Sequence, residues 1–134
     1  MQQICYTEGY RFQLRSATSY QLRITLPYGV ISSTGLFGIT ETGRFWINAN
    51  YAWNGANKPA INTKTIIPPS LFHDAGYQLL EEKLLSREYK AFFDNMFREM
   101  CLECGMAEIR AQYAYIAVKK FGRAETPRPL LYAP

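Results

Sequence analysis

The chain holds one histidine, His73, and only two aspartates, Asp74 and Asp94. Imidazole and carboxylate groups together bind divalent metals and transfer protons, so these three residues are the candidates for a catalytic centre. One hypothesis is a metal-dependent hydrolase acting on cell-wall or phosphoester substrates, in which the carboxylates hold the metal and His73 ligates it or relays a proton. A catalytic zinc usually has three protein ligands, often two of them histidines, and this chain offers one.

The same residues have a structural interpretation. Asp94 interrupts an apolar helical pattern, and a carboxylate there costs free energy unless a donor pairs with it. His73, Arg98 and the backbone of the turn at 53–57 are the candidate donors. In this interpretation His73 and Asp94 hold two helices together, and Tyr77 lies on the same helix face as His73. The residue types favour this structural pair, so we expect no bound metal or cofactor.

Cys101 and Cys104 form a C-x-x-C motif, which suggests either a zinc site or a redox pair. A structural zinc needs four ligands, and only the remote Cys5 and His73 could complete the set. A thioredoxin-like pair would begin a helix, whereas this one lies at the end of a predicted helix, just before Gly105. We therefore predict reduced thiols that pack in the core.

Length, composition and charge exclude several classes of protein. The 134 residues are 48% hydrophobic and 19% charged, which predicts one ordinary globular domain. The formal charge of +4 comes from scattered basic residues, a distribution that argues against nucleic-acid binding as the main role. No apolar run is long enough for a membrane-spanning helix, and the N-terminus lacks the layout of a secretory signal. The phosphate-binding glycine motifs of nucleotide enzymes are also absent from the sequence.

The first half of the chain predicts strands and turns. Aromatic and branched residues alternate with polar ones between turn-forming residues, which is typical of a small antiparallel sheet. We expect four or five strands, within residues 9–16, 19–26, 35–40, 44–50 and 61–67.

The second half predicts three helices. The first is expected from about Ser70 to Glu82, because the Pro68-Pro69 pair blocks an earlier start. The second is expected from an N-cap at Ser86 to a C-cap at Gly105. The third is expected over about residues 107–121, with Ile109, Tyr113 and Ile116 recurring. The chain is thus predicted to be a single α+β domain over residues 1–124, followed by a proline-rich arm at 125–134.

The aromatic content predicts a binding surface. Ten Tyr, eight Phe and two Trp exceed what so small a core can enclose, and Tyr and Trp are frequent anchors of interfaces. The candidate binding residues are Trp53, Asn54, Tyr77, Leu130, Leu131 and Tyr132. The last three lie on the proline-rich arm, which could dock on a partner chain, on a neighbouring copy or on its own domain.

Four blocks of the sequence, over about residues 44–124, resemble a family of short proteins from tailed bacteriophages and prophages that is catalogued as a domain of unknown function. They are G-A-N-K-P (55–59), F-H-D-A-G-Y-Q-L (72–79), F-D-N-M-F (93–97) and G-M-A-E-I-R-A-Q-Y-A-Y-I-A-V-K-K-F-G (105–122). The resemblance implies a phage origin and an α+β domain, located in the virion or the host cytoplasm. It implies no established reaction.

This chain departs from the family pattern in one turn. Where the family resembles T-D-G-A-S-x-P, this chain has Asn54 in place of the aspartate and Asn57 in place of the serine. The loss of that carboxylate favours the structural interpretation of the neighbouring polar residues. We therefore expect a phage protein that binds other phage proteins or a host protein, as a virion component or a host-interaction module, and that could form homo-oligomers. The alternatives are the hydrolase and, from the positive charge, an inhibitor of host nucleic-acid machinery.

Overall fold

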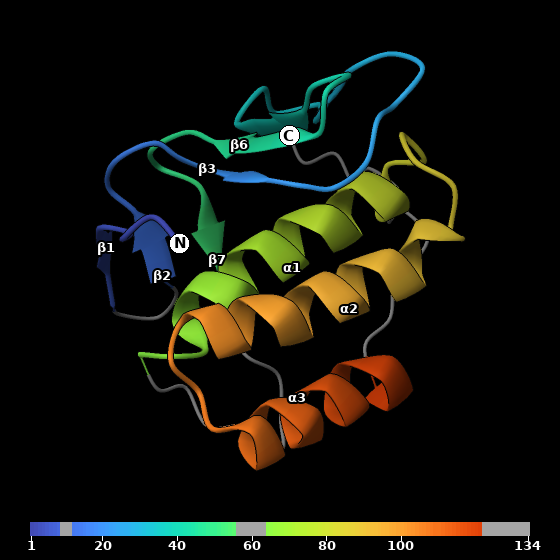
Figure 1. Ribbon diagram of the computed structural model, residues 1–134. Helices are drawn as coiled ribbons and strands as arrows, with labels where there is room; N and C mark the ends of the chain where they lie inside the picture. The colour runs from blue at the N-terminus through green and yellow to red at the C-terminus, as the bar shows by residue number, and fades with distance from the viewer. Residues whose placement is uncertain (9–11, 56–63, 122–134) are drawn as a thin grey trace, which may run out of the picture.

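The computed structural model describes residues 1–8, 12–55 and 64–121. Strands occupy the N-terminal half and three helices the C-terminal half, which confirms the predicted α+β class. The molecule is layered: the sheet that contains β3 and β6 covers α1 and α2, and α3 lies on the other side of this helix pair (Figure 1). No helix among these residues is of a length and hydropathy that would let it cross a bilayer.

The described strands are short and form two antiparallel sheets, where a single sheet of four or five strands was expected. Their bounds are β1 (Tyr6–Thr7), β2 (Phe12–Leu14), β3 (Thr18–Gln21), β4 (Val30–Ile31), β5 (Phe37–Ile39), β6 (Arg44–Ile47) and β7 (Ala52–Trp53). One sheet has the order β1-β2-β7 and the other β3-β6-β5-β4. The long expected strands are interrupted because the chain leaves the ladder at several turns, including those at Gly35 and Gly43, both with positive φ.

The four-stranded sheet has one apolar and one polar face. Phe45 and Ile47 of β6 point to the helices and are buried, and the Phe45 ring lies 5.3 Å from that of Phe72. Arg44 and Trp46 alternate with them and therefore point to the opposite face. This alternation places the main core between the sheet and the α1–α2 pair.

Helix α1 (Ile67–Glu81) begins three residues earlier than expected. Pro68 and Pro69 lie within its first turn, where a missing backbone N–H breaks no helical hydrogen bond, so the prediction that they exclude the helix was wrong. The strand expected at 61–67 was also wrong for its described part, because residues 64–66 form a turn that leads into α1. Residues 61–63 lie outside the described part of the chain.

Helices α1 and α2 (Tyr89–Glu103) end in the same type of turn. After α2, Gly105 has a φ of 92°, and the amides of Gly105 and Met106 donate to the carbonyls of Leu102 and Cys101, which confirms the predicted C-cap. At its start, α2 begins at Tyr89, and Ser86 is three residues ahead of it rather than at the cap.

Helix α3 (Glu108–Phe121) packs on α2 through a second apolar cluster. Its buried residues are small, Ala111 and Ala114, and they lie in one cluster with Phe97 and Cys101 of α2, against which Val118 is partly buried. The spacing of Ile109 and Tyr113 predicted the helix correctly, and these two side chains lie on its exposed side. The expected arm at 125–134, with Leu130, Leu131 and Tyr132, lies outside the described residues.

Candidate functional site

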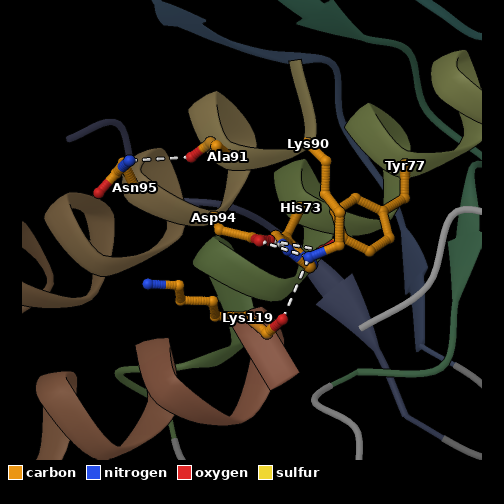
Figure 2. Close-up of polar contacts among 7 residues, drawn as sticks. All are labelled: His73, Tyr77, Lys90, Ala91, Asp94, Asn95 and Lys119. Atoms are coloured by element: carbon orange, nitrogen blue, oxygen red, sulfur yellow. Dashed lines mark hydrogen bonds and ion pairs between the residues drawn. The ribbon is translucent and has the colours of Figure 1, made fainter. Parts of the chain in front are cut away.

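Three donors converge on the carboxylate of Asp94 between α1 and α2 (Figure 2). Nε2 of His73 lies 2.8 Å from Oδ1, and the Tyr77 hydroxyl donates to the same oxygen at 2.5 Å. Nζ of Lys90 donates to Oδ2 at 2.8 Å. The structure thus confirms the expected pairing of His73 with Asp94, and both carboxylate oxygens are satisfied.

The spacing along each helix explains this convergence. His73 and Tyr77 are four residues apart on α1, and Lys90 and Asp94 are four apart on α2, so each pair shares one helix face. The His73 and Tyr77 rings lie 4.1 Å apart, and the His73 ring is also 5.1 Å from that of Phe97. Aromatic packing therefore fixes the orientation of the donors that Asp94 requires.

Burial and hydrogen bonding together determine the charge state of the cluster. His73 and Asp94 are only 5% and 2% exposed. Burial lowers the pKa of His73 below 6.5, and this effect outweighs the opposing effect of Asp94. The hydrogen bonds from His73, Lys90 and Tyr77 outweigh the burial of Asp94 and lower its pKa. The pair is therefore a neutral imidazole that donates from Nε2 to an ionised carboxylate.

Lys90 links this cluster to α3. Its ammonium group donates to Asp94 on α2 and, at 3.3 Å, to the backbone carbonyl of Lys119 in the last turn of α3 (Figure 2). It also lies 5.8 Å from the centre of the Tyr77 ring. One side chain thus connects all three helices. About a third of this side chain is exposed, so it is partly in contact with water.

Sequence reasoning found one of the three donors of Asp94. Arg98, proposed as a donor, instead donates from Nε to Oε1 of Gln112 on α3 at 2.9 Å. Lys90 and Tyr77 were missed as donors, although Lys90 precedes Asp94 by four residues, which is the usual spacing of a helical ion pair. Asp74, the third candidate catalytic residue, is half-buried next to His73 on α1 and acts on Tyr77 through its charge.

The proposed binding residues occupy very different environments. Trp53 is 0% exposed and donates its indole N–H to the Ser70 hydroxyl at 2.9 Å, so its side chain lies in the core. Tyr77 is buried against Asp94, and Asn54 is exposed. The three residues of the proline-rich arm fall outside the described part of the chain.

The cysteines are all free thiols. Cys101 is buried between α2 and α3, and burial raises its pKa to about 12. Cys104 is half-buried, with Sγ 3.5 Å from the sulfur of Met1. Among residues 1–8, 12–55 and 64–121, no three His, Cys, Asp or Glu side chains are grouped so that they could hold a metal ion.

Comparison with known proteins found no matching family model, no similar curated protein and no similar solved structure.

Proposed function

We propose that this protein acts by binding another protein, and that the outer face of α3 is its contact surface. Ile109 and Tyr113 are 77% and 73% exposed, and Ile116 is 38% exposed. The steps of four and three residues place these side chains on one face of the helix. We call these three residues the α3 stripe.

The α3 stripe is the observation that carries the proposal. The helix buries Ala111 and Ala114 and partly buries Val118 against α2, and it leaves its larger residues Ile109 and Tyr113 mostly in water. A helix that served only to cover the core would place the large side chains inward. Grouped exposed apolar side chains mark interaction surfaces, and a tyrosine among them is typical of interfaces.

The geometry of the Asp94 cluster supports binding over hydrolysis. A hydrolytic centre must admit water and a substrate to its acid and base groups. His73 and Asp94 are buried and already bonded to each other, and the carboxylate also accepts from Tyr77 and Lys90. This arrangement is suited to holding α1 against α2.

The sequence resemblance to the family of short bacteriophage proteins adds an origin and a class of partner to this proposal. The protein would belong to a bacteriophage and act in the virion or the host cytoplasm. It would act as a structural or assembly component or as a host-interaction module, and its partner would be another phage protein or a host protein.

A photo-crosslinking residue at position 113 tests the proposal. We expect irradiation in cells that express the chain to give one adduct of defined mass, either a second copy or a different protein. Ile109→Lys combined with Ile116→Lys should abolish this adduct. The control carries the crosslinker at Tyr28, which is exposed on a loop. Equal adducts from positions 28 and 113, or an adduct at 113 that survives both substitutions, would contradict the proposal.

A further inference from the structure

A hollow lies on the outer face of the four-stranded sheet, on the side opposite α1 and α2. It has a volume of about 290 Å³. One wall is formed by residues 17–19 at the start of β3, and the other by Arg44, Trp46 and Asn48, which alternate along β6 and just beyond it. Gln2 completes the lining. In Figure 1 this face of β3 and β6 is turned away from the helices.

A glycine positions the aromatic part of the hollow. Gly38 of β5 lies directly opposite Trp46 of β6, and a Cβ atom at Gly38 would be 2.8 Å from the indole and 2.4 Å from the Val30 carbonyl oxygen. Only glycine therefore lets the indole lie against the sheet over β5. The hollow lies on the other side of Trp46, towards β3, so the indole is presented to it as a fixed apolar wall.

The polar part of the hollow offers hydrogen-bond donors that a ligand could use. Within the described chain, the side chains of Arg44, Trp46 and Asn48 make no hydrogen bond or ion pair. The Gln2 carbonyl oxygen accepts from the Thr18 hydroxyl at 3.0 Å and from the backbone N–H of residue 19 at 3.3 Å. These two bonds fix the amide so that its NH₂ group remains available.

Charge and size define the ligand that fits. No carboxylate lines the hollow, and Arg44 gives it a positive charge. Ligand pockets are usually about 300–1,000 Å³, so this one has room for a single ring rather than for the base, sugar and phosphate of a nucleotide. Amide and hydroxyl groups beside an aromatic wall match a ring that carries several oxygen atoms.

We propose that this hollow binds a single acidic sugar unit, a sugar ring that carries a carboxylate or a phosphate. The anionic group pairs with the Arg44 guanidinium, which binds such groups through two parallel hydrogen bonds. The apolar face of the ring packs on the Trp46 indole. The ring hydroxyls accept from the amides of Gln2 and Asn48. This binding site is separate from the α3 stripe and does not depend on the function proposed for it.

Two tryptophans make the test direct, because the indole N–H signals of Trp46 and Trp53 can be followed by ¹⁵N NMR. Titration of the full chain with glucuronate or with glucose 6-phosphate should shift the Trp46 signal and leave the buried Trp53 signal in place. The two probes distinguish a carboxylate ligand from a phosphate ligand. Glucose, which lacks the charge, should bind at least tenfold more weakly.

Matched variants complete the test. Arg44→Gln should weaken binding of the acidic sugar by about 10–100-fold, as expected for the loss of a charge-assisted hydrogen bond. Lys120→Gln removes the same charge on α3, on the far side of the molecule, and should leave binding unchanged. The proposal is overturned if neither acidic sugar shifts the Trp46 signal or if glucose binds equally well. It is also overturned if Arg44→Gln binds like the parent chain, or if adenosine monophosphate binds and the sugars do not.

Discussion

The two buried faces of α2 are built differently. Towards α1, the interface contains an ionised carboxylate, Asp94, with three donors of defined geometry. Towards α3, the buried contacts are apolar and involve Phe97, Cys101 and Met106, while hydrogen bonds such as that of Arg98 lie near the surface. Directional contacts fix the register of α1 on α2, whereas α3 depends on packing of apolar surfaces. Substitutions should therefore cost more at the first interface than at the second.

The largest expected effect follows from Asp94→Ala. It leaves the buried donors of His73 and Tyr77, and the partly exposed Lys90, without their shared acceptor, and we expect a loss of about 1–3 kcal/mol in the free energy of unfolding. Urea denaturation followed by circular dichroism measures it. Asp94→Asn keeps the size of the side chain and one acceptor oxygen, and should cost less. A loss below about 1 kcal/mol for both variants would show that the cluster contributes little to stability.

The free energy of unfolding should depend on pH through the protonation of His73. Its pKa is lowered in the folded state, so the unfolded chain binds a proton first as the pH falls below 6.5. Stability is therefore retained above this pH and decreases below it, with a slope of at most about 1.4 kcal/mol per pH unit. Asp94, whose pKa is also lowered, adds a further loss below its ordinary value of 3.8.

His73→Gln provides the control for this pH dependence, because the chain has no other histidine. The slope between about pH 6.5 and 5 should flatten in the variant. The measurement is the urea midpoint at each pH. A parent slope that persists in His73→Gln would assign the effect to other groups.

A smaller effect is expected on the α3 side of α2. Cys101→Ala removes a buried sulfur between α2 and α3 and should cost on the order of 1 kcal/mol through the cavity that it leaves. Thermal melting measures this loss. A metal chelator should leave the melting temperature of the parent chain unchanged, and a chelator effect equal to that of the substitution would indicate a metal-bound thiolate.

The smallest effect is expected on the outer side of α3. Ile109→Lys combined with Ile116→Lys should change the free energy of unfolding by no more than about 0.5 kcal/mol per residue, because both side chains face water. Denaturation at low protein concentration separates this value from any effect of association. A loss comparable to that of Cys101→Ala would show that the α3 stripe contributes to the fold.

The sequence predicted the helices better than the sheets. Helix α2 could be predicted from nearby residues alone, because the apolar periodicity of residues 89–104 marks its length and the glycine at 105 marks its end. The strands are two to four residues long, and their pairing depends on distant partners, such as Phe12 with Trp53. Periodicity also cannot choose between the two faces of a helix, and it therefore could not show that Ile109 and Tyr113 face outwards.

The site was predicted only in part, because two of the donors of Asp94 are set by the packing of one helix on the other. A carboxylate within the apolar stripe of a helix requires a donor, and His73 was found by this argument. Tyr77 and Lys90 became evident as donors only when the packing of α1 on α2 was known. The outer hollow could not be predicted at all, because it depends on the register that places Trp46 beside Gly38.

The attachment of α3 has a consequence for native-state opening. Within the described parts of the chain, the helix is held mainly by α2, through an apolar cluster and the surface bonds of Arg98 and Lys90. It can therefore separate while the sheet, α1 and the rest of α2 keep their contacts. Amide hydrogens of α3 should exchange with solvent through this partial opening, faster than those of α1, whose side chains lie in the main core. We therefore expect two cooperative units of different local stability, with the α3 stripe in the weaker one.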